Sequence, residues 1–151
     1  MALADDIKLL AQVPLFSQLQ GDQLRLVAFG AERRGIAAGQ ELFRERSPAE
    51  SAFIVARGRF DLYATDRDGQ VSRQRSVGAG TLLSELALVT MVERKFTAVA
   101  AEDSETLKIT RSLFERLLEE YPDVGKVIEA RIRENIASLA KAAAALQYRF
   151  T

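Results

Sequence analysis

The sequence contains no cysteine and no histidine among its 151 residues. Without cysteine the chain forms no disulfide and holds no cysteine-ligated iron–sulfur cluster. Without histidine it lacks the common zinc ligand sets and the general base of a Ser/His or Cys/His catalytic pair. These absences exclude many enzyme classes, and we expect a protein that is not an enzyme and binds no metal.

The chain also lacks an excess of either charge, because 21 Lys and Arg residues balance 21 Asp and Glu residues. No net positive field draws it toward DNA, RNA or an anionic membrane. No apolar run approaches the roughly 20 residues that cross a bilayer. The first residues, MALADDIKLLAQV, carry acids where a signal peptide carries cations. The sequence therefore predicts a cytoplasmic protein without a membrane segment.

Hydrophobic residues make up 48% of the chain and charged residues 28%, which predicts a single globular domain over residues 1–151. Apolar residues recur at helical spacing over 3–29, which predicts two or three short helices. From 31 to 110, seven or eight short β-rich runs alternate with turn residues, and helical spacing returns over 111–147. We predict a mostly β fold with flanking α-helices: an antiparallel β-roll or jelly roll with N-terminal helices and a long C-terminal helix.

Two local signals support these boundaries. TDRDG at 65–69 resembles part of a calcium loop, but its position between two strands favours a hairpin turn. Thr110 precedes the amphipathic run RSLFERLLEEY and is suited to cap that helix. After Pro122 the last helix carries an apolar stripe, formed by Val124, Ile128, Ile132, Ile136, Leu139, Ala143 and Leu146. Arg131 and Asn135 interrupt a strict heptad, so this stripe indicates core packing, with a homodimer as an alternative.

The segment 82–100, LLSELALVTMVERKFTAVA, carries the candidate chemistry. We read LLSELALV as a short helical segment between strands, whose first-turn amides and dipole favour an anion. Arg94 follows it and offers a planar fork of donors to a phosphate. Glu85, expected to be buried beside Arg94, would accept a hydrogen bond from a sugar hydroxyl and offset the arginine charge. The alternative is a solvated surface ion pair between these two residues, which contributes little.

These residues resemble the cassette of cyclic nucleotide-binding domains, the family of catabolite-activator-type regulators, kinase regulatory subunits and nucleotide-gated channels. That cassette reads approximately F-G-E-x-A-L and then R-[ST/A]-A, and this chain has LSELAL at 83–88 and RKFTA at 94–98. Further segments resemble the family's first helical segment, strand-turn motif, central hairpin with Gly58 in its turn, and post-barrel helix: VPLFSQL (13–19), AAGQELFRE (37–45), AFIVARGRFDLY (52–63) and ITRSLFERLLEEYPDV (109–124).

The resemblance implies that Arg94 binds the phosphate and Glu85 binds the ribose. Ser84 stands where the family has a glycine whose bare backbone lets the phosphate approach. Lys95 stands where a small or hydroxyl residue is usual, and Arg46 with Ser47 replaces a glycine and an acid. The candidate ligand-binding residues are Leu83, Ser84, Glu85, Leu86, Arg94 and Lys95.

By this resemblance the chain is a regulatory module that binds cAMP or cGMP and signals to an effector protein through its C-terminal helix. The alternative is a ligand-free scaffold or protein-interaction domain in which Lys95 fills the pocket. A jelly-roll enzyme of the cupin class would lack its usual histidine ligands. Because the sequence ends at Thr151, soon after the last helix, we expect no helix-turn-helix and no direct DNA binding.

Overall fold

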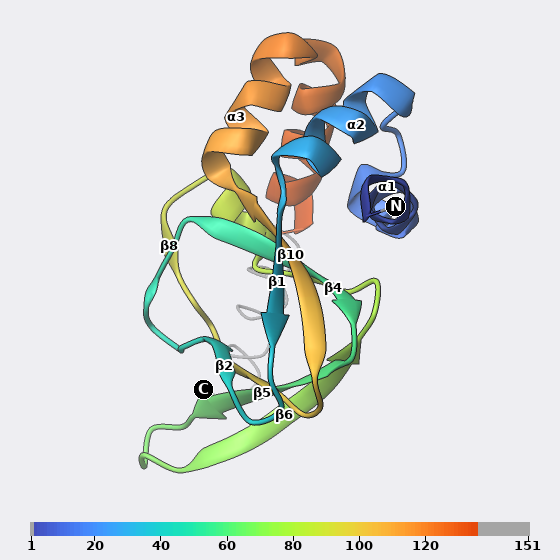
Figure 1. The fold of residues 1–151 in the computed structure, drawn as a ribbon. Coiled ribbons are helices and arrows are strands. Elements are labelled where there is room, and N and C mark those ends of the chain that lie inside the picture. Colours follow the sequence, from blue (N-terminus) through green and yellow to red (C-terminus); the bar gives the residue numbers. More distant parts are fainter. Residues whose placement is uncertain (1, 136–151) are drawn as a thin grey trace.

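The computed structural model describes residues 2–135 (Figure 1). Three short helical elements come first, ten strands with one short helical turn follow, and helices end the described chain. In order these are α1 (Ala2–Gln12), η1 (Pro14–Phe16), α2 (Gly21–Gly30), β1 (Glu32–Ile36), β2 (Glu41–Phe43), β3 (Pro48–Ala49), β4 (Ser51–Arg57), β5 (Arg59–Thr65), β6 (Val71–Gly78), β7 (Leu82–Leu83), η2 (Glu85–Leu88), β8 (Val92–Glu93), β9 (Thr97–Ala100), β10 (Ser104–Thr110), α3 (Arg111–Glu120) and a helix over 122–135.

The strands form an antiparallel β-roll. One four-stranded sheet has the order β1-β10-β4-β7, a second has the order β2-β9-β5-β6, and β3 pairs with β8. Strands distant in the sequence are neighbours, as in the pairing of β1 with β10. The predicted fold class is therefore confirmed, including the N-terminal helices and the start of a C-terminal helix. The expected continuation of that helix to residue 147 lies outside the described residues, and the boundary of a single domain over 1–151 stays a prediction.

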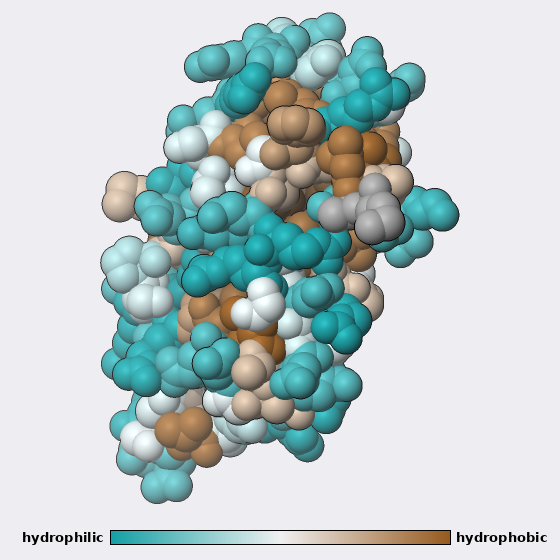
Figure 2. All heavy atoms as spheres, viewed as in Figure 1, coloured by the Kyte–Doolittle hydropathy of each residue, from teal (hydrophilic) through white to brown (hydrophobic). Residues whose placement is uncertain are grey.

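The helices gather at one end of the roll (Figure 1). The larger hydrophobic cluster lies there and joins Phe16, Leu88, Leu113 and Ile132. A second cluster fills the interior of the roll. Alternate residues of β4 serve the two clusters, because Ile54 packs with the helices and Val55 packs inside the roll. In the space-filling view, hydrophobic atoms show mainly among the helices, and hydrophilic side chains cover much of the rest of this face (Figure 2).

The chain changes sheets at Gly58, between β4 and β5. The sequence predicted a central hairpin here, and this prediction is wrong, because β4 belongs to the first sheet and β5 to the second. Gly58 has φ 93°, and a Cβ at this position would lie 2.1 Å from Ser104 Oγ and 2.8 Å from Ser104 Cα. The bend therefore requires glycine for its backbone conformation and for the close approach of β10.

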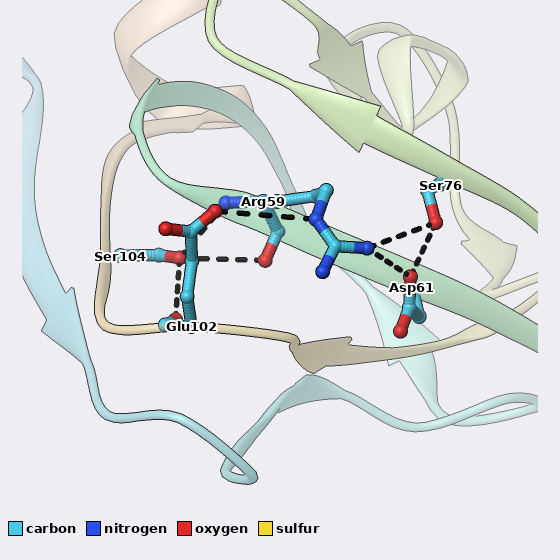
Figure 3. Close-up of polar contacts among 5 residues, drawn as sticks. All are labelled: Arg59, Asp61, Ser76, Glu102 and Ser104. Carbon is cyan, nitrogen blue, oxygen red and sulfur yellow. Dashed lines mark hydrogen bonds and ion pairs between the residues drawn. The ribbon is translucent and has the colours of Figure 1, made fainter.

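Polar contacts hold the start of β5 after this bend (Figure 3). The Arg59 N–H donates to Ser104 Oγ at 3.1 Å, and the Ser104 hydroxyl donates to the carbonyl of Glu102 at 2.8 Å. The Arg59 guanidinium lies 3.3 Å from Asp61 Oδ1, which also accepts a hydrogen bond from Ser76 on β6. These contacts join the start of β5 to β10 of the first sheet and to β6 of its own sheet.

The expected hairpin turn joins β5 and β6, as their pairing shows. Asp66 Oδ1 accepts hydrogen bonds from the N–H groups of Asp68 and Gln70, each at 2.9 Å, so its carboxylate stabilises the turn. Thr110 caps α3, since its hydroxyl oxygen accepts from Leu113 N at 3.1 Å. Within residues 2–135, no helix is both long enough and apolar enough to cross a membrane.

Candidate anion site and comparison with known proteins

The cassette begins as a strand and not as the expected helix over LLSELALV. Leu82 and Leu83 form β7 and pair with Ile54 and Phe53 of β4. A single 3₁₀ turn, η2, follows, in which the Ala87 N–H donates to the Ser84 carbonyl at 3.0 Å. Because Leu82 and Leu83 pair with β4, they adopt strand conformation and do not continue the helical turn. In such a turn the first amides have no acceptor within the turn, so they are suited to bind an anion, while one turn contributes little dipole.

Ser84 has a left-handed backbone, with φ 64° and ψ 41°. Arg46, with φ 71°, is the other non-glycine residue with positive φ in the described chain. At both positions the resembling family has glycine. The backbone therefore keeps the conformation that a glycine would favour, although this chain supplies larger side chains.

The side chain of Arg94 is buried inside the roll, with the residue 7% exposed. Its Nη1 donates to the Ser51 carbonyl at 2.7 Å, and its Nη2 donates to Ser51 Oγ at 3.2 Å. The guanidinium carbon lies 4.6 Å from the ring centre of Phe43 and 5.4 Å from that of Phe53. Strands β2 and β4 thus supply two aromatic faces and a carbonyl that fix the plane of the guanidinium.

No carboxylate lies within ion-pair distance of Arg94 among the residues of the described range. Burial lowers the pKa of the Arg94 guanidinium, and the more distant charge of Glu50 raises it. Asp6, the other buried charged residue described, pairs with Arg33. A buried cation without a paired anion is unfavourable. Only two of the five N–H donors of the Arg94 guanidinium have a partner within the described range. The other donors are available to hydrogen-bond an anion.

Glu85 faces different surroundings from Arg94. It lines a cavity of about 530 Å³ between η1 and the helix over 122–135, together with Arg131, Asn135 and apolar residues of η1 and β7. Burial raises the pKa of the Glu85 carboxyl, and a hydrogen bond from the Asn135 side chain lowers it. Arg94 does not line this cavity. The expectation that Glu85 offsets the Arg94 charge is therefore wrong, and so is the alternative of a solvated surface pair, because Arg94 is buried.

The other predicted site residues divide between core and surface. Leu83 is buried in the interior of the roll, whereas Leu86 packs against the helical cluster. Lys95 is exposed. The alternative in which Lys95 fills the pocket is therefore wrong, because the buried cation is Arg94.

The sequence prediction missed the residues that contact Arg94 and Glu85: Ser51, Phe43, Phe53 and Asn135. In the sequence, Phe53 was visible only within the expected hairpin AFIVARGRFDLY (52–63), and Phe43 only within the motif AAGQELFRE (37–45). Strand register decides which side chains meet, and alternation alone does not reveal register between distant strands.

Replacing Ser84 with glycine is expected to stabilise the ligand-free domain by about 0.5–1 kcal/mol, because a left-handed L-residue is strained and the greater freedom of unfolded glycine offsets part of the gain. Thermal unfolding measures the change. Arg46→Gly is the matched variant, because it relieves a similar backbone conformation at an exposed position. A loss of stability in Ser84→Gly would show that the serine side chain contributes more than its backbone strain removes.

The stability of the domain is expected to depend on pH through Glu85. Because the folded pKa of this carboxyl is raised above 4.5, the stability that it contributes is fully present below the unfolded pKa and is lost as pH rises through the folded pKa. Glu85→Gln removes this titration. The melting temperature of the variant minus that of the wild type should therefore increase from pH 3 to neutral pH. A difference that is independent of pH would contradict the desolvation of Glu85.

The chain is similar to known proteins in sequence and in fold. The cyclic nucleotide-binding domain family matches residues 33–121. The "Cyclic AMP receptor protein" of Thermus thermophilus is 29% identical over 125 residues, covering 80% of this chain and 58% of that protein. "Lysophospholipase NTE1" of Chaetomium globosum is 32% identical over 111 residues, covering 71% of this chain but 7% of the lysophospholipase. The chain thus spans a small part of some of its relatives.

A solved structure of a "Cyclic nucleotide-binding-like protein" from Brucella abortus superposes with a TM-score of 0.69 at 43% identity. The superposition covers 76% of this chain and 98% of the Brucella protein. The family match includes β10 and α3 and spans the whole cassette from Leu82 to Ala100. The chain therefore belongs to the cyclic nucleotide-binding domain family.

Proposed function

We propose that this domain senses a cyclic nucleotide, cAMP or cGMP, whose phosphodiester binds to Arg94. The observation that carries this proposal is the buried guanidinium of Arg94, which Ser51 and two aromatic rings hold in place without a paired carboxylate. A phosphodiester anion would supply the missing charge and accept hydrogen bonds from the remaining donors of the fork. The relatives named as a cyclic AMP receptor protein and a cyclic nucleotide-binding-like protein support the ligand class.

The cassette residues have separate roles in this proposal. The first amides of η2, at Glu85 and Leu86, donate to the phosphate oxygens. The Glu85 side chain, which lies against Asn135 in the ligand-free chain, turns toward the nucleotide and accepts from a ribose hydroxyl. Leu83 supplies apolar packing inside the roll. Lys95, which is exposed, adds positive charge close to Arg94 in the chain. The side chain of Ser84 lies at the close approach to the phosphate and reduces the affinity.

The signal leaves the domain through the C-terminal helix in this proposal. Asn135 of that helix contacts Glu85, and Arg131 donates to the Pro14 carbonyl at 3.3 Å and to Ser17 Oγ at 3.4 Å. A ribose hydroxyl that donates to the Glu85 carboxylate competes with the Asn135 side chain for it. Nucleotide binding thereby shifts the C-terminal helix between its alternative positions. An effector protein, a homodimer, a cytoplasmic location and the absence of direct DNA binding stay predictions from the sequence.

A ligand-free scaffold domain is the second candidate, and one observation favours it. Ser51 already supplies two hydrogen bonds to Arg94, so the guanidinium is partly satisfied without any ligand. In that case the buried arginine would serve only to join β4 to the cassette.

Thermal unfolding with added nucleotide separates the two candidates. At about 100 times Kd a ligand stabilises the folded state by about 2.7 kcal/mol, which raises the melting temperature by roughly 5–10 °C for a domain of this size. We expect such a rise with cAMP or cGMP and a smaller one with 5′-AMP, whose phosphate is not cyclic. No rise with either cyclic nucleotide at millimolar concentration would overturn the sensor proposal and support the scaffold.

A further inference from the structure

Arg111, the first residue of α3, binds three backbone carbonyls that come from two different segments. Its Nε donates to Ala87 O at 2.9 Å. Its Nη2 donates to Ala49 O at 2.8 Å and to Thr90 O at 3.0 Å. Its own backbone N–H donates to Glu50 O at 2.9 Å. A single residue therefore joins α3 to β3 and to the end of η2.

These carbonyls explain why the residue is an arginine. Ala87 lies near the C-terminal end of η2, and Thr90 lies just beyond it. Carbonyl groups at this end accept no hydrogen bond within the turn. A planar guanidinium presents donors in several fixed directions, whereas an ammonium is a compact point charge. No carboxylate within the described part of the chain lies at ion-pair distance from Arg111. The backbone carbonyls are therefore its principal partners.

The two segments that Arg111 joins, which we call the Arg111 clamp, lead directly to the anion site. Thr90 precedes β8 and then Arg94, while Ala49 of β3 comes two residues before Ser51, which holds the Arg94 guanidinium. β3 and β8 pair with each other, and Arg94 N donates to Ser47 O at 2.9 Å, which extends that pairing. A displacement of Arg111 thus acts on both sides of the buried cation.

We propose that Arg111 is a positioning residue that couples the nucleotide cassette to α3. It fixes the end of η2, and through β3 and β8 it fixes the place of Arg94. Because coupling between two sites is reciprocal, a ligand that moves the cassette also acts on the first residue of α3. This inference rests on the proposed function for its ligand, but the clamp itself is a property of the ligand-free chain.

Two variants and one control test the clamp. Arg111→Met removes all three side-chain hydrogen bonds, and Arg111→Lys restores the charge without the planar fork. Arg116→Met is the control, because Arg116 lies on the same helix and is exposed, and its one hydrogen-bond partner among residues 2–135 is Glu120 of that helix. Hydrogen exchange is measured without ligand over residues 85–92 and over β10, and cAMP affinity is measured by calorimetry for each chain.

We expect Arg111→Met to raise hydrogen exchange over 85–92 by about tenfold or more and to weaken cAMP binding by about tenfold. Each lost hydrogen bond from the charged guanidinium removes a substantial part of the stabilisation of this segment. Arg111→Lys should fall between Arg111→Met and the wild type, and Arg116→Met should match the wild type. Unchanged exchange over 85–92, or an equal rise over β10, would overturn the proposal. If the wild type fails to bind cAMP, the proposed ligand fails, and the exchange data still decide whether the clamp exists.

Discussion

Replacing Arg94 with methionine is expected to weaken cyclic nucleotide binding by about a hundredfold or more, because truncating one partner of a buried charge pair costs about 2–5 kcal/mol. The wild-type guanidinium is already oriented by Ser51 and by the rings of Phe43 and Phe53. Binding therefore uses donors that need little further ordering. Calorimetric titration of both chains with cAMP and cGMP measures the loss.

Methionine is chosen because it retains an unbranched side chain against the two rings. It leaves the Ser51 carbonyl without a donor, which destabilises the folded state by about 1–3 kcal/mol. It also removes an uncompensated buried cation, which stabilises the folded state. The ligand-free melting temperature should therefore change by only a few degrees. Arg34→Met, at an exposed position of β1, serves as the control and should bind as the wild type does. Equal affinity in Arg94→Met and the wild type would place the ligand elsewhere.

Replacing Gly58 with alanine is expected to destabilise the domain by about 2–4 kcal/mol, from overpacking and a strained backbone together. The new Cβ would lie 2.1 Å from Ser104 Oγ and 2.8 Å from Ser104 Cα, so part of the clash is with backbone that cannot rotate away. Denaturant unfolding measures the free energy of unfolding.

Gly69→Ala is the matched control for this variant. Gly69 has φ 80°, close to the 93° of Gly58, but a Cβ there would meet nothing within 4 Å. It should lose only the backbone contribution, about 1 kcal/mol. Similar losses in the two variants would show that the contact with Ser104 contributes nothing to the bend.

Except at Leu82 and Leu83, which form β7 where a helix was expected, the order and type of the elements were accessible from the sequence, because most elements depend on residues close together in the chain. Helical spacing predicted α1, α2 and α3, and Thr110 marked the start of the last of these. The resemblance to the family located two positions where glycine is usual, and Ser84 and Arg46 both have positive φ. Local backbone conformation was thus predictable even where the residue type differs.

The surroundings of the site were not predictable in the same way, because they depend on contacts between distant segments. The sequence placed Glu85 beside Arg94 because only nine positions separate them, but Arg94 meets residues from β2 and β4. Glu85 meets Asn135, fifty positions away. The central hairpin was wrong for a similar reason: a strand that continues past Gly58 into a second sheet has the same alternation as a hairpin.

Calorimetric titration of the wild-type chain with cAMP and with cGMP measures whether the domain, with its buried Arg94, binds a cyclic phosphodiester. We expect saturable binding of one nucleotide per chain for cAMP, cGMP or both, with no comparable binding of the uncharged nucleoside. The absence of saturable binding by both cyclic nucleotides at millimolar concentration would contradict the sensor proposal.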